Sequence, residues 1–200
     1  GMKKAAVNLA HAAKYVGAGT VEFIVEPDTG EFFFLEVNAR LQVEHPVTEG
    51  VTDLDLVRLQ IEVASGKSLA DLIPEFLDGN RQNLRGHCIE ARIVAENPAQ
   101  GFMPSIGQIV AWAEPKMPGV RIDTGFGPSS EVTRFYDSLI AKVIVTAPNR
   151  AEAIARMCIA LQDFHIIGVK INIGYLLDVF DHAEFQSGDI DTGFLRREFD

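Results

Sequence analysis

The sequence predicts an α+β protein, in which antiparallel strands and helices occupy separate stretches of the chain. Two runs of β-branched and aromatic residues flank Pro27-Asp28-Thr29-Gly30, a strong turn signal typical of a hairpin. In the second half, strand-like segments separated by proline and glycine come first, and helix-like segments follow. This order of strands before helices favours α+β over an alternating α/β fold.

The first half of the chain contains three predicted helical segments around the hairpin. Residues 3–16 show apolar side chains at helical spacing, with glycine directly after them. Residues 54–64 repeat this pattern, and Thr52 or Asp53 is the expected N-cap. Residues 68–77 form a short helical or turn segment that Pro74 interrupts.

The second half is expected to be a separate domain. Residues 78–85 are polar and turn-rich, so we place the boundary there, with domains at 1–83 and 84–200. Beyond it, strand composition and helical periodicity define six further elements. The strands are expected at 87–95, 108–113, 120–124 and 138–146, and the helices at 150–163, capped by Asn149, and at 171–180.

Composition excludes several classes of protein. The net charge of -10 argues against nonspecific binding to nucleic acid or to an anionic membrane surface. Cys88 and Cys158 lie in apolar runs and form no zinc pattern, so buried thiols in a reducing cytoplasm are expected. No apolar run reaches the roughly 18 residues of a membrane span, and no signal peptide is evident.

The hairpin carries a pair of acidic residues. If Glu26 faces Phe32, then Glu22 faces Glu36, and two carboxylates directly opposite one another repel. A cation held between them would remove this repulsion. The alternative is a solvated strand face with incidental acids, because glutamate is usually exposed.

The same register divides the hairpin into two faces. One face is apolar and expected to meet the core: Phe23, Val25, Phe33, Leu35 and Val37. The other face carries the acids with Ile24, Phe34 and Asn38. Two carboxylates and an amide oxygen are hard ligands that suit Mg²⁺ or Mn²⁺, and Mg²⁺ commonly needs only one or two protein carboxylates.

A second polar group follows the hairpin. Arg40, Gln42 and Glu44 alternate in a run that we expect to be extended, since His45 precedes a proline. A guanidinium suits a planar anion such as a carboxylate, bicarbonate or phosphate. Glu44 is placed to act as a general base.

These residues carry a resemblance. The run FLEVNARLQVEHPVTEGVTDLDLVRLQIEVASGKSL resembles the metal and bicarbonate segment of biotin carboxylases, members of the ATP-grasp superfamily. RGHCIEARIVAEN resembles a strand of the C-terminal domain of that family. The resemblance implies the end of an ATP-grasp domain, built of antiparallel strands and helices, followed by a β-rich biotin carboxylase C-terminal domain with closing helices.

The resemblance also implies roles for individual residues. Glu22, Glu36 and Asn38 would bind the metal, and Ile24 would line the nucleotide site beside the two acids. In the loop that follows, the implied bicarbonate ligands are Arg40, Gln42 and Val43, and the implied catalytic residues are Arg40 and Glu44.

Arg92 has two interpretations. On its residues alone, Arg92 would form a salt bridge with Glu90 on the same face of an edge strand. The resemblance instead implies that Arg92 binds carboxyphosphate or the ureido group of biotin.

The implied activity is ATP- and bicarbonate-dependent carboxylation of biotin held on a separate carrier domain, which works with a carboxyltransferase. The resemblance places the N-terminal domain and half of the ATP-grasp core outside the chain, so we expect the chain alone to be inactive and the intact enzyme to be a homodimer. Two alternatives stay open: another ATP-grasp carboxylase or ligase, and a non-catalytic oligomerisation module. The final acceptor of the carboxyl group also stays open.

Overall fold

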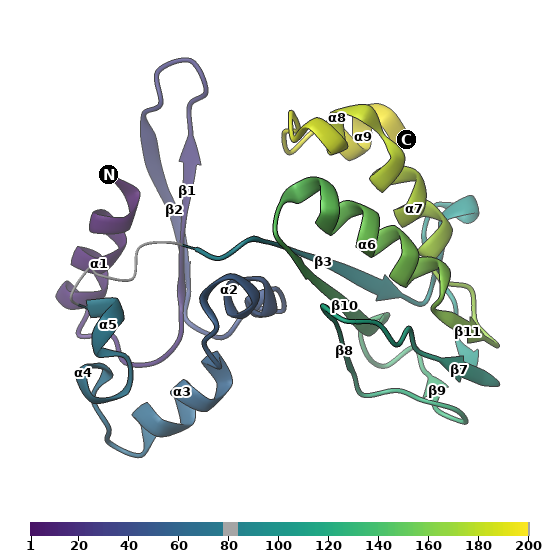
Figure 1. Cartoon of the computed structure of the whole chain (residues 1–200), viewed down its shortest axis with the longest axis horizontal. Coiled ribbons are helices and arrows are strands. Elements are labelled where there is room, and N and C mark those ends of the chain that lie inside the picture. The colour runs from purple at the N-terminus through teal and green to yellow at the C-terminus, as the bar shows by residue number, and fades with distance from the viewer. Residues whose placement is uncertain (78–83, 200) are drawn as a thin grey trace. The chain divides into compact units, whose positions relative to one another are not determined.

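A computed structural model describes residues 1–77 and 84–199, which contain both helices and small antiparallel sheets, as predicted (Figure 1). The chain divides into two compact units, Gly1–Leu84 and Arg85–Asp200. Most of the polar segment 78–85 lies outside the described residues, so the domain boundary stays a prediction. Among the helices described, none has the length and apolar character needed to cross a membrane.

Unit 1 consists of one hairpin and short helices. Its strands β1 (Thr20–Val25) and β2 (Phe32–Asn38) pair antiparallel. Its described helices are α1 (Met2–Ala12), α2 (His45–Thr52), α3 (Leu56–Ala64), α4 (Leu69–Leu72) and α5 (Pro74–Leu77). The predicted segment 68–77 is therefore two short helices, with Pro74 at the start of the second.

Neither residue predicted as the N-cap of α3, Thr52 or Asp53, caps this helix. Asp55 is the cap, and its Oδ1 accepts a hydrogen bond from the Arg58 N–H at 2.8 Å. Asp53 instead ends α2 in the left-handed conformation, with φ of 62°. The sequence analysis did not predict α2, in which Pro46 occupies the first turn, where a missing N–H costs nothing.

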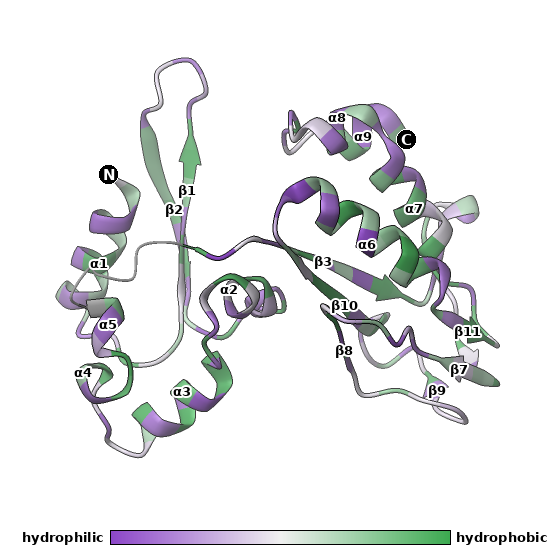
Figure 2. Ribbon diagram, viewed as in Figure 1, coloured by the Kyte–Doolittle hydropathy of each residue, from purple (hydrophilic) through white to green (hydrophobic). Residues whose placement is uncertain are grey.

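The hairpin keeps its apolar side chains open to solvent, contrary to the expected core face. On that expected face, Phe33 and Leu35 are more than half exposed, Val25 is 45% exposed and Val37 is 42% exposed. Figure 2 colours much of both strands as hydrophobic. In the described part of unit 1, the fully buried apolar side chain is that of Pro46. A two-stranded hairpin is marginally stable by itself and needs further strands or a helix against its apolar face. The described residues of unit 1 leave this face largely exposed.

Unit 2 is built on a three-stranded antiparallel sheet in the order β3-β10-β8. These strands are β3 (His87–Val94), β8 (Val120–Thr124) and β10 (Leu139–Ala147), close to the predicted positions. Pairs of short strands surround them: β4 (Glu96–Asn97) with β5 (Met103–Pro104), β6 (Gly107–Gln108) with β9 (Glu131–Val132), and β7 (Ala111–Ala113) with β11 (His165–Ile167). The 3₁₀ turn η1 (Pro98–Gln100) joins β4 to β5.

Helix α6 (Arg150–Gln162) covers one face of this sheet (Figure 1). Met157 and Leu161 of α6 are fully buried and belong to the same core as Val143 and Val145 of β10. Asn149 caps the helix as predicted, accepting a hydrogen bond from the Glu152 N–H at 3.0 Å. Helices α7 (Ile173–Asp181), α8 (Ala183–Ser187) and α9 (Phe194–Phe199) close the unit.

Two predictions about unit 2 have different outcomes. The strand expected at 108–113 is two short strands, because the chain changes partner: the Ile109 N–H bonds to Ser130 and the Val110 N–H to Ile167. Both cysteines are free thiols, as expected, with Cys88 buried and Cys158 half-buried. Burial raises the pKa of both thiols.

Gly168 tests the packing of this partner change. Its φ is +121°, and a Cβ there would lie 2.1 Å from the Gln108 carbonyl oxygen. We expect Gly168→Ala to lower the free energy of unfolding by about 1–3 kcal/mol in urea denaturation, through backbone strain and this contact. Gly174→Ala is the matched control, because a Cβ at this helical glycine meets nothing within 4 Å. Equal stability of the two variants would contradict the prediction.

Candidate functional site

The two acids of the hairpin face each other, as predicted. Glu22 of β1 and Glu36 of β2 are direct partners in the antiparallel ladder. The register that leads to them differs from the expected one, because Val25 rather than Glu26 faces Phe32. A β-bulge at Leu35 adds one residue to β2 and restores the acid pair.

The bulge corrects the predicted faces of the hairpin. Phe34 lies opposite Phe23 rather than Ile24, and their rings meet edge to face at 6.5 Å. Phe33 lies opposite Ile24. The predicted faces were wrong for Phe33 and Phe34 because the expected register contained no bulge. Ile24 still shares the β1 face of Glu22, two residues away.

Amide groups bridge the two carboxylates. The Asn38 Nδ2 donates to Glu22 Oε1 at 2.6 Å and to Glu36 Oε1 at 3.1 Å. The Gln42 Nε2 also donates to Glu22 Oε1, at 3.3 Å. These N–H donors offset the repulsion between the acids. The structure therefore brings together all three predicted metal-binding residues and one predicted bicarbonate ligand.

The donors fit a hard divalent ion. No group of three or more His, Cys, Asp or Glu side chains with metal-site geometry occurs in residues 1–77 and 84–199. Two facing carboxylates with an adjacent amide match the one or two protein carboxylates that Mg²⁺ takes, with water and phosphate oxygens completing its shell. Rotation of the Asn38 amide would present its oxygen instead of its nitrogen.

The segment after the hairpin turns instead of extending. Glu44 is the N-cap of α2, with φ of −83° and ψ of 8°, and the Val47 N–H bonds to its carbonyl at 3.1 Å. The His45 Nδ1 lies 2.8 Å from the Gln42 carbonyl oxygen. The expected extended run over 40–44 was therefore wrong, because Pro46 starts a helix here.

This turn sets the directions of the predicted anion-binding residues. Gln42 points back to Glu22, as its hydrogen bond shows. Arg40 and Glu44 are exposed, and the Arg40 Nη1 donates to the Leu41 carbonyl at 3.2 Å. Val43 is half-buried in the turn. A basic and an acidic side chain are thus open to solvent within four residues of each other.

Arg92 belongs to unit 2, on the edge strand β3. Its Nε lies 3.8 Å from Glu90 Oε1, so the salt bridge considered from the sequence is present. The Arg92 side chain is 49% exposed and that of Glu90 only 4%. A carboxylate buried to this degree needs compensating charge.

Lys142 of β10 supplies part of that charge. Its Nζ lies 3.9 Å from Glu90 Oε2 and 3.5 Å from Asp123 Oδ2. Asp123 also accepts two hydrogen bonds from Arg121, at 2.7 and 2.8 Å. Burial raises the pKa of Asp123, but Arg121 and Lys142 outweigh burial and lower this pKa below its usual value.

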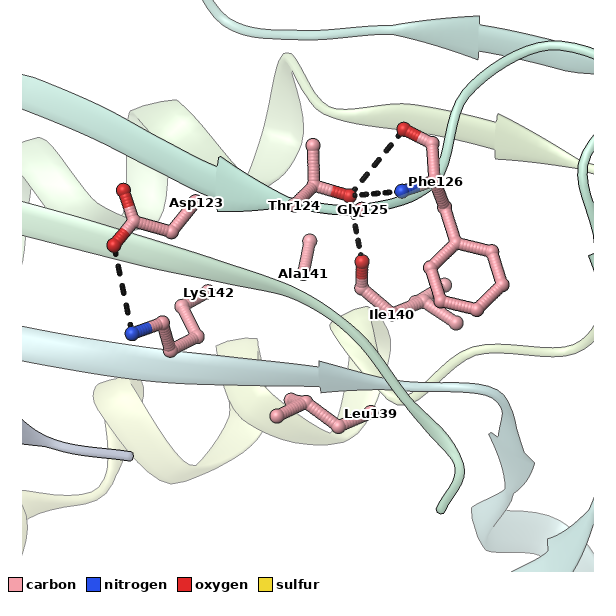
Figure 3. A pocket seen from close by; sticks show the side chains of 8 residues that line it. All are labelled: Asp123, Thr124, Gly125, Phe126, Leu139, Ile140, Ala141 and Lys142. Atoms are coloured by element: carbon pink, nitrogen blue, oxygen red, sulfur yellow. Dashed lines mark hydrogen bonds and ion pairs between the residues drawn. The ribbon is translucent and has the colours of Figure 1, made fainter. Parts of the chain in front are cut away.

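Lys142 and Asp123 lie at one end of a pocket of about 260 Å³ between β8 and β10. Figure 3 shows these two side chains facing each other, with Phe126, Leu139 and Ile140 farther along the pocket. Sequence reasoning assigned no role to Lys142. The sequence does contain a signal for Lys142, because it is the one charged residue in the apolar run LIAKVIVTA. A charge in such a strand predicts an oppositely charged partner on a neighbouring strand.

Family models match both units. The model of the biotin carboxylase C-terminal domain matches residues 90–197. The model of the ATP-binding domain of the carbamoyl-phosphate synthase L chain matches residues 1–72.

Individual proteins match almost the whole chain. Biotin carboxylase 1 of Bacillus subtilis is 46% identical over 97% of this chain and 42% of its own length. The propionyl-CoA carboxylase alpha chain of Homo sapiens is 44% identical, over 97% of this chain and 26% of its own length. The chain thus spans less than half of these curated relatives.

Solved structures match as well. The biotin carboxylase domain dimer of the Hydrogenobacter thermophilus 2-oxoglutarate carboxylase, in complex with MgADP, ADP and bicarbonate, is 39% identical with a TM-score of 0.85. That match covers 96% of this chain and 41% of the other. Rhizobium etli pyruvate carboxylase T882A is 38% identical with a TM-score of 0.89, over 98% of this chain and 20% of the other.

Asn38 tests the bridge between the acids. We expect Asn38→Ala to speed amide hydrogen exchange in β1 and β2 about tenfold, because a hydrogen bond to a charged group contributes roughly 1.5 kcal/mol. Adding Glu36→Gln should slow the exchange again, since the like-charge pair is gone. A double variant that exchanges as fast as Asn38→Ala would show that repulsion between the acids is not the cause.

Asp123 predicts a pH dependence. Because its pKa is lowered in the folded chain, its stabilisation is complete above its unfolded pKa of about 3.9 and is lost as pH falls through the lower folded value. Asp123→Asn should be less stable than the parent protein at pH 7, and the difference should shrink as pH falls below the unfolded pKa and through the lower folded pKa. Urea unfolding at several pH values measures this, with the exposed Asp163→Asn as control. A constant difference at all pH values would contradict it.

Proposed function

This chain belongs to the biotin carboxylase family, and from that premise we propose that it is the C-terminal part of a biotin carboxylase, an ATP-dependent ligase that carboxylates carrier-bound biotin. The observation that carries the proposal is the Glu22–Glu36 pair, bridged by Asn38 and followed directly by the Arg40–Glu44 turn. Because the chain spans less than half of its curated relatives, the activity is proposed for a longer protein.

The hairpin acids would serve the nucleotide. Glu22 and Glu36, with the Asn38 amide oxygen, would hold Mg²⁺ or Mn²⁺ against the phosphates of ATP. The bound ion supplies neutralisation of the charge that develops as a phosphoryl group is transferred. Ile24 is exposed on the same β1 face as Glu22 and would provide apolar contact for the adenine.

The turn after the hairpin would handle bicarbonate. The Arg40 guanidinium can bind the planar anion in a bidentate way, and Gln42 and the Val43 backbone would orient it. Glu44 would remove the proton of bicarbonate, whose oxygen attacks the γ-phosphorus of ATP to form carboxyphosphate, while the bond to the β-phosphate breaks and ADP leaves. Glu44 is exposed at the start of α2, which leaves it accessible for this role.

Arg92 would act on the second half of the reaction. Carboxyphosphate breaks down to CO₂ and phosphate, phosphate takes the N1 proton of biotin, and the resulting enolate needs a positive charge beside its oxygen. Arg92, with its exposed guanidinium on β3, and Arg40 would supply that charge. Biotin would come on a separate carrier domain, and a carboxyltransferase would use the carboxybiotin. We further propose a homodimer in the cytoplasm for the intact enzyme.

Two substitutions in the full-length protein separate the proposed roles. Glu44→Gln should lower bicarbonate- and biotin-dependent ATP cleavage at least about 100-fold, because a positioned general base contributes 10² to 10⁴ in rate, while MgADP binding measured by calorimetry stays unchanged. Glu36→Gln should weaken MgADP binding. Glu31→Gln, at the exposed tip of the hairpin, is the charge-matched control and should change neither. Full turnover in Glu44→Gln would remove this residue as the base.

A further inference from the structure

Arg92 is held by a side chain distant in sequence. β3 is an edge strand, so the backbone groups on its outer edge have no neighbouring strand in the sheet. Asn172, which precedes α7 and is 7% exposed, occupies this edge. Its Oδ1 accepts from the Val94 N–H at 2.9 Å, and its Nδ2 donates to the Arg92 carbonyl oxygen at 3.0 Å.

This pair of bonds imitates a neighbouring strand. A primary amide has the same donor and acceptor as a peptide group, so the Asn172 side chain replaces one residue of a missing partner. Both of these hydrogen bonds are made to the segment 92–94. The backbone of Arg92 is therefore fixed between β10 on one edge and Asn172 on the other.

The side chain of Arg92 is held by a separate group of charges. Lys142 lies directly opposite Arg92 in the β3–β10 ladder, where two like charges are unfavourable. Glu90 offsets this, because its carboxylate oxygens lie 3.8 Å from the Arg92 Nε and 3.9 Å from the Lys142 Nζ. Lys142 is only 12% exposed and cannot move away without losing Asp123 as well.

Stability alone does not account for this arrangement. An ion pair to a half-exposed arginine contributes little, whereas burying Glu90 and Lys142 has a desolvation cost that apolar residues would avoid. The contacts do restrain Arg92 at two points. Asn172 holds its backbone carbonyl, and Glu90 lies in ion-pair distance of the Nε of its half-exposed side chain. A guanidinium ordered in advance loses less entropy when it binds a planar anion.

We propose that Asn172 and Glu90 are positioning residues for Arg92, which they hold ready for an anionic oxygen group such as a carboxylate, phosphate or enolate. This inference rests on the proposed function only for the identity of that group. The positioning itself is a property of unit 2 and can be measured on the 200-residue chain.

The first experiment measures the order of Arg92. In the chain labelled with ¹⁵N, we expect Asn172→Asp and Glu90→Gln each to lower the heteronuclear NOE of the Arg92 Nε–Hε group, because Glu90→Gln removes the carboxylate that lies 3.8 Å from this Nε. Asn172→Asp keeps an acceptor for the Val94 N–H and removes only the donor to the Arg92 carbonyl. Asn149→Ala is the matched control, because it removes an asparagine side chain that also makes two hydrogen bonds, at the start of α6.

The outcomes of this experiment are distinct. An unchanged Arg92 signal in both Asn172→Asp and Glu90→Gln would overturn the positioning role. So would an equal loss of order in Asn149→Ala, which would indicate general loosening of unit 2. Should Asn172→Asp not fold, Glu90→Gln alone decides, since a glutamine retains the shape of the glutamate.

The second experiment measures turnover in the full-length protein. Asn172→Asp and Glu90→Gln should lower kcat about tenfold, as loss of an outer partner of a functional residue does, with the KM for MgATP unchanged. Asn149→Ala should keep the parental kcat. Full turnover in Asn172→Asp together with a mobile Arg92 would overturn the importance of positioning. Full turnover in Arg92→Met would instead contradict the proposed function of Arg92. The NMR experiment would then decide by itself whether Arg92 is held in position.

Discussion

Strand β10 is the constraint on which unit 2 depends. It pairs along both edges, with β3 and β8, and it is buried beneath α6 through residues such as Val143. A central strand of this kind tolerates a charge only where its neighbours neutralise it. Lys142 lies in the middle of β10, and Glu90 on β3 and Asp123 on β8 provide the neutralising carboxylates. The charged group around Arg92 is thus a consequence of where the sheet places one lysine.

In unit 1 the equivalent constraint is a single extra residue. The bulge at Leu35 brings Glu36 opposite Glu22, and without it the two acids would fall out of register. A bulge also increases local twist, and here it moves Phe33 and Phe34 to faces that strict alternation does not predict. Bulges often re-aim side chains beside functional sites, which agrees with the role proposed for the two acids.

Unit 1 also keeps features that are unfavourable for an isolated chain. Two carboxylates face each other, and large apolar side chains of the hairpin, among them Ile24 and Phe33, remain more than half exposed. Local conflicts of this kind are expected where a protein binds a ligand or a partner. Unit 2, in contrast, buries its apolar residues in one core around Met157 and Leu161. The proposed chemistry is therefore concentrated in the unit with the weaker core, with Arg92 the exception.

The sequence by itself determined the long elements, because their signals are local. Helical spacing located α6 and its Asn149 cap, strand composition located β3 and β10, and the turn at 27–30 located the hairpin and its facing acids. Only the tertiary structure decided features that depend on distant partners. The strands of two or three residues, the bulge at Leu35 and the bond from Asn172 to Arg92 exist because segments far apart in the chain meet. Asn172 and Arg92 are 80 residues apart, and no periodicity within either segment records that contact.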